Sequence, residues 1–298
     1  MSAPASELSS SSTFRPARGG VLGVLQRIAA DPMGLLGLSL VTLLILTGIF
    51  ADWLAPYDPI KMNMQERLAG PSWAHPLGTD NIGRDVFSRV IKGTQIALTV
   101  AAATTFLALV GGLTLGLLAG YGPRWLDNFL LLVFDSVYSF PSIMLQLAVI
   151  TLLGPSLGTV ILVIVVSTIP AYARLVRTST LSVKTSEFIL AERSMGASLP
   201  RIMVRHLLPN VIGPLLIIAS MDVPVVIAIE AGLSFLGLGV RPPAPSWGNI
   251  LNDGFSFIRV TPWIVIGGGI PLVLATLGFT FLGEALRDQL DPKLRKDR

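Results

Sequence analysis

Six apolar runs constrain the fold of this 298-residue chain more than any other feature. The first, 32–51, lies between Asp31 and Asp52 and contains no charged residue. About twenty apolar residues in a helix suffice to cross the ~30 Å hydrocarbon layer of a bilayer. The remaining runs are 93–121, 125–153, 157–173, 211–237 and 262–283. Because backbone polar groups in lipid must bond within the protein, the sequence predicts an all-α, polytopic membrane protein with six transmembrane helices.

The composition excludes several other classes of protein. With 52% hydrophobic and 13% charged residues, the chain is unlike an ordinary soluble domain. It has no cysteine, which excludes disulfides, thiolate metal sites and thiol catalysis. Its two histidines, His75 and His206, are far apart in sequence, so a zinc hydrolase helix of the HExxH type is absent. We therefore predict no metal site.

Lysine and arginine residues are shared unequally between the two sides of this topology. Fifteen of the 22 fall on the side that holds both termini, and seven fall on the other. The positive-inside rule therefore predicts that both termini are cytosolic. The net charge of +4 is then explained by the excess of basic residues on the cytosolic side of the membrane. Nucleic acid is therefore not an expected partner.

These assignments divide the chain into four parts. We predict a cytosolic N-terminal tail over 1–30, of which 1–20 is too poor in apolar residues to fold. The first transmembrane helix and an external loop follow over 31–92. A five-helix core occupies 93–287, and a cytosolic tail occupies 288–298. No apolar core followed by a small-residue cleavage site occurs near the start, so a cleaved signal peptide is not expected.

A charged segment, 187–210, separates the fourth and fifth apolar runs, and we call it the elbow. Its sequence, EFILAERSMGASLPRIMVRHLLPN, predicts a helix over 187–195 that ends at Gly196. Ser198 is then expected to cap a second short helix, which Pro209 stops. An alternative is a basic loop that only fixes topology. The elbow residues predicted to carry function are Glu187, Phe188, Ala191, Glu192, Arg193, Met195, Gly196, Ser198, Arg201 and Pro209.

Three acidic residues, Asp135, Asp222 and Glu230, lie well inside apolar runs, away from their ends. Charged groups at this depth are expensive and usually functional. We predict that Asp135, Tyr138, Pro141 and Asp222 line a translocation pathway, with the Pro141 kink freeing backbone carbonyls. The alternative is a structural hydrogen bond between helices, which we favour for Glu230.

Catalysis by the chain itself is not expected. Two intramembrane aspartates, such as Asp135 and Asp222, could form the catalytic dyad of an intramembrane aspartyl protease. The Gly-x-Gly-Asp segment of these proteases is absent from the chain. A serine protease is not expected either, because His206 lies in the cytosolic loop. No lysine follows a glycine, so a Walker A phosphate loop is excluded. If the chain belongs to a pump, its energy comes from another polypeptide.

The external loop carries Asp80, Arg84 and Asp85 between the turn residues Gly78 and Gly83. These charges either contact a docking protein or pair with one another as a solvated network. For any single charge we favour pairing, because exposed ion pairs are common and weak.

Several segments resemble the C-type permeases of ABC importers for dipeptides, oligopeptides and nickel. Aligned on Gly196, the elbow is similar to their EAA loop, with Ala191 as the central alanine. Leu190 stands where the family has its glutamate and Glu192 where it has the second alanine. A contact of that glutamate therefore cannot be transferred to Leu190, although Glu187 or Glu192 can substitute for it. The other similar segments are 31–37, 75–89, 139–142, 230–239, 242–248 and 286–292.

This resemblance covers about 31–295 and implies a type I importer permease fold, with the elbow as the helix that couples to a cytosolic ATPase. It implies a homologous permease as heterodimer partner, two ATP-binding subunits, an external solute-binding protein and the lipid of a bacterial inner membrane. ATP and Mg²⁺ would be used by the partners, with no cofactor on this chain. Family members carry dipeptides, longer peptides, nickel, glutathione or haem, and family frequency favours peptides. An ion-coupled secondary transporter that acts without an ATPase is the alternative.

Overall fold

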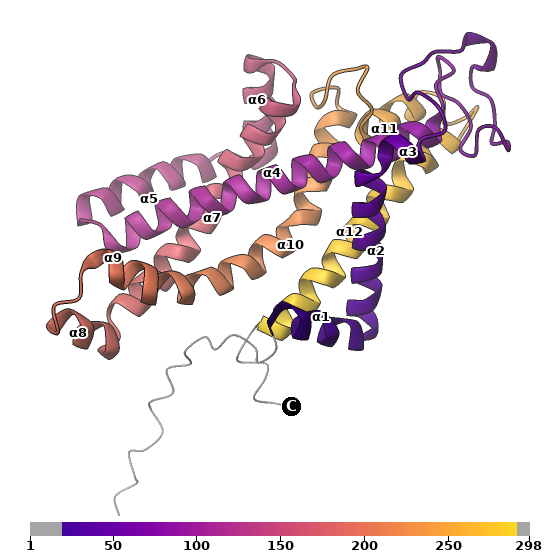
Figure 1. Cartoon of the computed structure of the whole chain (residues 1–298). Helices are drawn as coiled ribbons and strands as arrows, with labels where there is room; N and C mark the ends of the chain where they lie inside the picture. The colour runs from indigo at the N-terminus through magenta and orange to yellow at the C-terminus, as the bar shows by residue number, and fades with distance from the viewer. Residues whose placement is uncertain (1–19, 291–298) are drawn as a thin grey trace, which may run out of the picture.

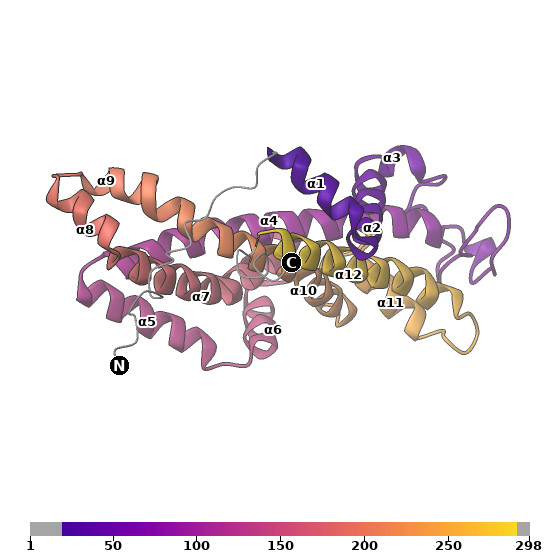
Figure 2. The same ribbon diagram turned by 90° about the horizontal axis from the view of Figure 1, so that it is seen from below.

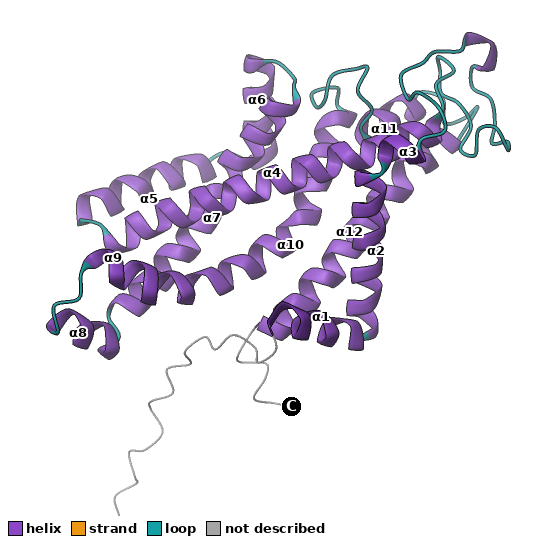
Figure 3. Ribbon diagram, viewed as in Figure 1, coloured by secondary structure: helices purple, strands orange, loops and turns teal. Residues whose placement is uncertain are grey.

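The computed structural model describes residues 20–290, and over this range it contains helices and loops but no strand (Figure 3). The membrane-scale helices are α2 (Pro32–Ile49), α4 (Val86–Tyr121), α7 (Leu157–Lys184), α10 (Leu208–Phe235) and α12 (Trp263–Leu290). The shorter elements are α1 (Gly20–Ala30), α3 (Ala51–Leu54), η1 (Met64–Glu66), α5 (Arg124–Tyr138), α6 (Ser142–Leu153), α8 (Glu187–Ser194), α9 (Leu199–Ile202), η2 (Met203–Leu207) and α11 (Trp247–Phe255).

The prediction of six membrane spans agrees with this architecture, with one change in the third. Five helices are long and apolar enough to cross a membrane, and the pair α5 and α6 makes a sixth if it crosses as one span. The two members of this pair are bent by 88°. Pro141 lies in the break between α5 and α6, and proline disfavours helical geometry in the residue before it. The kink predicted at this proline is therefore a sharp change of direction.

α4 and α7 both extend well beyond the predicted apolar runs. α4 starts at Val86, where the Asp85 carboxylate accepts a hydrogen bond from the Ser88 N–H at 2.7 Å and caps the helix. α7 continues past residue 173 to Lys184, so that Arg174 lies inside a helix. Neither extension shows in the apolar pattern, because both contain charged residues.

The N-terminal tail predicted over 1–30 includes a helix. Residues 20–30 form α1, and Ile28 is buried with 1% of its surface exposed. α1 packs against α2 and α12. The rest of the predicted tail, 1–19, lies outside the described residues, as do residues 291–298 of the C-terminal tail.

α4 and α7 form the most extensive helix pair in the molecule. Glycines at one-turn intervals on α4 face α7, and Gly112 and Gly116 lie against Tyr172 and Val176. Small residues permit such a close approach of helices in a membrane. α10 packs on this pair and on α12, while α2 packs along α12 (Figure 1).

The two ends of the bundle differ in structure. α1, α8 and α9 lie along the lower side of Figure 1, whereas α11 and the loop before α4 lie at the upper right. In the orthogonal view, the same loop and α11 remain at the end opposite α8 and α9 (Figure 2). The elbow and the external loop are therefore at opposite ends of the molecule.

Candidate functional site

The elbow is formed by α8, α9 and η2, which lead directly into α10. α8 covers Glu187–Ser194, close to the predicted helix. Gly196 has φ of +83°, the left-handed conformation predicted for it. The prediction that Pro209 stops a helix is wrong. The chain passes through the π-turn of η2 into α10, and Pro209 occupies its first turn, where the missing N–H has no helical partner to lose.

The elbow is fixed to the core through a small apolar cluster. Ile189, Ile202 and Leu207 are completely buried, and Tyr121 at the end of α4 packs against them. Lys184 at the end of α7 donates a hydrogen bond to the Gly120 carbonyl at 3.3 Å. Its ammonium also lies 4.9 Å from the centre of the Tyr121 ring. The elbow is therefore in direct contact with the ends of α4 and α7.

The opposite face of the elbow is exposed and apolar. Phe188, Ala191 and Met195, the residues predicted to share a face, are all exposed, and Met195 has 76% of its surface accessible. Leu190 is 50% exposed. Apolar side chains gathered on a water-exposed projection indicate an interaction surface.

The charged residues of the elbow divide into two groups. Glu187, Arg193 and Arg201 are exposed. Glu192 is less accessible, and its carboxylate lies 3.4 Å from Nε2 of His206 within the elbow. Of the two acids that can replace the family glutamate, Glu187 is thus the one open to a partner. Ser198 is exposed, and its carbonyl accepts the first helical hydrogen bond from the Ile202 N–H at 3.1 Å.

A second polar cluster lies within the bundle, and we call it the intramembrane cluster. It consists of Asp135, Tyr138, Tyr172, Arg174 and Asp222, from α5, α7 and α10. The Arg174 guanidinium donates a hydrogen bond to the Asp135 carboxylate at 2.6 Å. The guanidinium also lies 4.6 Å from the centre of the Tyr138 ring.

Asp222 completes the intramembrane cluster from α10. It lies near the hydroxyls of Tyr172 and Tyr138. Three of the four residues predicted to line a pathway thus share one cluster, while Pro141 lies at the break between α5 and α6. Asp135 and Asp222 have separate partners, so they do not form a carboxylate pair of the proteolytic kind.

Sequence reasoning missed Arg174 and Tyr172. The predicted apolar run ends at residue 173, so the apolar pattern gives no sign that Arg174 belongs to the same helix. The signal that identifies it is the absence of a helix breaker between Pro170 and Lys184. Tyr172 and Arg174 therefore lie in one unbroken helix that continues to Lys184.

Glu230 is completely buried near the other end of α10. The Ser234 hydroxyl donates a hydrogen bond to its carboxylate at 2.7 Å. The Val240 N–H in turn donates to the Ser234 hydroxyl at 3.3 Å. These contacts tie the end of α10 to the loop that follows it, and they support the structural interpretation of Glu230.

The external charges Asp80, Arg84 and Asp85 are buried, so the expectation of a solvated network is wrong. Asp80 accepts hydrogen bonds from Arg84 Nε at 2.6 Å and from an N–H of Arg89. Arg84 and Arg89 also both donate to Asp253 of α11 at 3.0 Å. Because Asp80, Arg84 and Asp85 are buried, they do not lie on the outer surface. The ion pairs of Asp80 and Arg84 with Arg89 and Asp253 hold the external loop against α4 and α11.

A histidine completes the external network. His75 Nδ1 lies 2.8 Å from the Asp85 carboxylate, and its Nε2 lies 3.3 Å from Glu66. A structural role for these groups is sufficient to explain their burial, since charges buried outside water must be paired.

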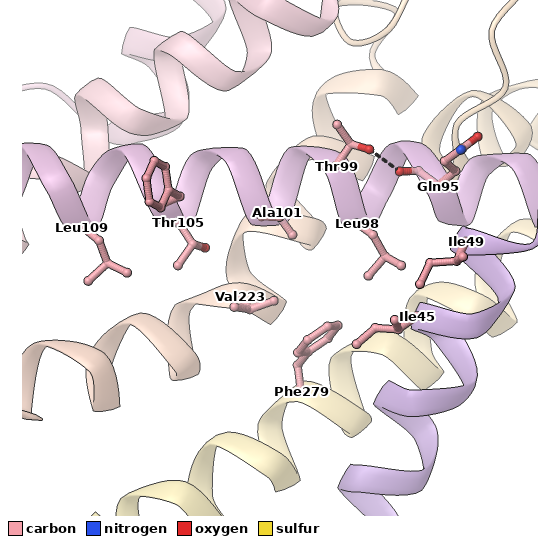
Figure 4. A pocket seen from close by; sticks show the side chains of 13 residues that line it. Ile45, Ile49, Gln95, Leu98, Thr99, Ala101, Thr105, Leu109, Val223 and Phe279 are labelled. Atoms are coloured by element: carbon pink, nitrogen blue, oxygen red, sulfur yellow. Dashed lines mark hydrogen bonds between the residues drawn. The ribbon is translucent and has the colours of Figure 1, made fainter. Parts of the chain in front are cut away.

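An apolar hollow of about 640 Å³ lies between α2, α4, α10 and α12 (Figure 4). Ile45, Leu98 and Phe279 project into it in Figure 4. The Thr99 hydroxyl on its wall donates to the Gln95 carbonyl of its own helix at 2.7 Å. No charged side chain of the described residues lines this hollow. It is suited to apolar groups such as lipid chains.

Comparison with known families gives two matches. Residues 112–296 match the binding-protein-dependent transport system inner membrane component. Residues 23–71 match the N-terminal transmembrane domain of oligopeptide transport permease C. The two matches together cover the elbow, the intramembrane cluster and the first membrane helix.

Individual relatives are similar over most of their length. The chain is 39% identical over 270 residues to the dipeptide transport system permease protein DppC of Alkalihalophilus pseudofirmus, which covers 91% of this chain and 89% of the relative. It is 41% identical over 256 residues to the glutathione transport system permease protein GsiD of Pectobacterium atrosepticum, with 86% and 85% covered.

Solved structures agree at the level of the fold. The methionine ABC transporter MetNI in inward-facing conformations aligns with a TM-score of 0.55 at 21% identity, over 68% of this chain and 97% of that chain. An amino acid ABC transporter solved with histidines aligns with a TM-score of 0.52 at 15% identity, over 66% and 91%.

Proposed function

Because this chain belongs to the family of binding-protein-dependent transport system inner membrane components, the permease subunits of ATP-driven ABC importers, we propose that its elbow couples the membrane helices to a separate cytosolic ATPase. The observation that carries this proposal is the two-sided structure of the elbow. One face is anchored to α4 and α7 through Ile189 and Leu207, and the other exposes Phe188 and Met195.

The proposal extends to the whole assembly. Two ATP-binding subunits bind ATP and Mg²⁺, a homologous permease forms a heterodimer with this chain, and an external protein delivers the solute. The lysine and arginine distribution supports cytosolic termini and a cytosolic elbow. Closure of the ATPases then moves the elbow, and the spans alternate between inward-open and outward-open arrangements.

Peptides are the proposed solute. The relatives include dipeptide and glutathione permeases, and both names describe short peptides. The chain has no cysteine, and no group of metal-binding side chains occurs among the described residues. This chemistry does not favour a metal ion such as nickel.

Replacing Gly196 tests the coupling role of the elbow. Gly196→Pro cannot keep φ near +83°, and it removes the N–H that donates to the Arg193 carbonyl at 3.0 Å. We expect normal membrane insertion but at least a ~10-fold loss of ATP-dependent uptake of a labelled dipeptide, with ATP hydrolysis no longer stimulated by transport. A tenfold loss corresponds to about 1.4 kcal/mol of coupling free energy. The assay uses the complete complex reconstituted in liposomes.

Gly196→Asn is the matched control, because asparagine tolerates the left-handed conformation. A Cβ at this position meets no atom within 4 Å, so the control introduces no clash within the chain. Normal uptake by the proline variant would refute the coupling role. Ion-driven uptake by the purified chain alone would instead support the secondary-transporter alternative.

A further inference from the structure

The apolar hollow of Figure 4 extends along α4, and we call it the groove. Its wall on α4 runs from Gln95 to Leu109 and includes Leu98, Ala102 and Phe106, which recur at intervals of three or four residues and so share one helix face. At 1.5 Å per residue this wall is about 21 Å long. One leaflet supplies half of the ~30 Å hydrocarbon layer. The groove therefore has the length needed for an acyl chain.

The groove opens to the outside of the helix bundle and is narrow. Ile49 and Phe106 on its wall have 66% and 65% of their surface exposed. Its volume is about 640 Å³, with Val223 of α10 and Phe279 of α12 on the inner side. A helix of the same length and ~10 Å diameter would fill about 1,600 Å³. The groove is thus too small to enclose a helix of another subunit, whereas a slender apolar chain can enter it.

A polar cleft of about 440 Å³ adjoins one end of the groove. It is lined by residues 55–60 together with Asp52 and Lys92. Lys92 joins the two spaces, because its ammonium donates a hydrogen bond at 3.4 Å to the Gln95 side-chain carbonyl on the wall of the groove. The same ammonium pairs with Asp52. An occupant of the groove can therefore place a polar end in the cleft.

The ion pair of Lys92 and Asp52 lies at the boundary between apolar and polar sequence. The first apolar run ends at Asp52, and the second begins directly after Lys92. Their ion pair brings these two boundaries together in space. Trp53 beside it is 84% exposed, and its ring lies 5.6 Å from that of Phe50. Exposed tryptophan is typical of the membrane–water interface, so the groove falls on the lipid side of this boundary and the cleft on the water side.

The charges of the cleft match a zwitterionic headgroup. The cleft contains one ammonium group, on Lys92, and two carboxylates, on Asp52 and Asp58. The Asp52 side chain remains 71% exposed in its pair with Lys92, and Asp58 is also exposed. A phosphate can therefore pair with Lys92 while a primary ammonium donates to the carboxylates. A headgroup with a phosphate and no ammonium would meet an excess of negative charge.

The loop that forms the cleft is fixed to α4. The Tyr57 N–H donates a hydrogen bond at 3.1 Å to the hydroxyl of Ser88, which is completely buried. The Asp58 carboxylate accepts a hydrogen bond from the Ile60 N–H at 3.0 Å, which orients it within the loop. The cleft is therefore a formed feature that needs no rearrangement to receive a headgroup.

We propose that the groove and the cleft together form a binding site for one phosphatidylethanolamine molecule. One acyl chain lies in the groove between α2 and α4, the phosphate pairs with Lys92, and the ethanolamine ammonium donates to Asp52 and Asp58. The lipid fills the space between the first membrane helix and the rest of the bundle. This site goes beyond the import function and is independent of the solute that is carried.

Photolabelling tests the groove in the complete complex reconstituted in liposomes. The probe is phosphatidylethanolamine with a diazirine near the end of one acyl chain. Labels should concentrate on residues 98–109 and on Phe279, and unlabelled phosphatidylethanolamine should compete at least fivefold better than phosphatidylglycerol with the same chains. Ala102→Trp fills the groove and should abolish this labelling. Val110→Trp, at an exposed position of α4 outside the groove, should leave it unchanged.

Lys92→Gln tests the headgroup contact. It should raise about fivefold the mole fraction of probe needed for half-maximal labelling, the most that an exposed ion pair contributes. Lys61→Gln is the matched control, because Lys61 is exposed in the same external loop but lies outside the cleft. Equal effects of the two lysine changes, or labels spread evenly over the exposed residues of α4, would overturn the site. A groove that stays unlabelled in the natural chain would also overturn it, and would indicate that another subunit covers this face.

Discussion

The external network shows how far single residues can be interpreted from sequence. Pairing among Asp80, Arg84 and Asp85 was expected, but burial was not. Burial depends on Asp253, which lies 169 residues after Arg84 and comes from α11. No local pattern reveals a partner so distant in sequence. Gly196 was predicted correctly because its conformation depends on its immediate neighbours alone.

Asp80→Asn tests the energetic role of this network. The change keeps the shape of the side chain but removes the negative charge that Arg84 and Arg89 share. Removing one partner of a buried ion pair leaves the other charge uncompensated, at a cost of about 3–5 kcal/mol. We therefore expect a clearly lower thermal unfolding midpoint for the purified protein in detergent.

Asp52→Asn provides the comparison for this measurement. Asp52 pairs with Lys92 near the same end of the molecule, but its side chain is 71% exposed. An exposed pair contributes at most about 1 kcal/mol. Equal shifts of the unfolding midpoint in the two variants would show that burial does not strengthen the external network.

Among the elements, the pair α4 and α7 is the best defined from sequence and from structure. Glycine-rich helices favour close contact in a membrane, and the partner face for the glycines of α4 is supplied by Tyr172, Val176 and Thr180 of α7. The apolar pattern did not reveal the 88° bend between α5 and α6 or the continuation of α7 to Lys184. The apolar pattern identifies segments that can contact lipid. Charged residues that face a cavity interrupt this pattern without ending the helix.

Gly116→Ala tests this helix contact. A Cβ at residue 116 would lie 2.5 Å from Cβ of Val176 and 2.6 Å from the Ala173 carbonyl oxygen. Neither atom can move without a shift of α7, and overpacking of this kind costs about 1–3 kcal/mol. We expect a lower unfolding midpoint and less assembled complex on size-exclusion chromatography.

Gly232→Ala on α10 is the corresponding control, because a Cβ there meets no atom within 4 Å. Alanine also favours the helix over glycine by about 1 kcal/mol. The control should therefore be neutral or slightly stabilising. A Gly116 variant as stable as this control would mean that α4 and α7 do not pack as closely as the structure shows.

At the scale of the whole molecule, the elbow and the external loop lie at opposite ends, and the charge distribution predicts a membrane side for each. The assignment matters because a cytosolic ATPase can bind the elbow only from inside. The chain allows a direct test, since it lacks cysteine and has an exposed reporter position at each end. Trp73 of the external loop is fully exposed, and Met195 of the elbow is 76% exposed.

Single-cysteine variants at these two positions make the prediction concrete. In spheroplasts, a membrane-impermeant maleimide should label Trp73→Cys and leave Met195→Cys unlabelled, because the more basic side of a membrane protein remains in the cytosol. After lysis both should react, and the natural chain should show no labelling in either condition. Labelling of Met195→Cys in intact spheroplasts would place the elbow outside the cell. No cytosolic ATPase could then drive the spans through it, and the exposed apolar face of α8 would need an external partner instead.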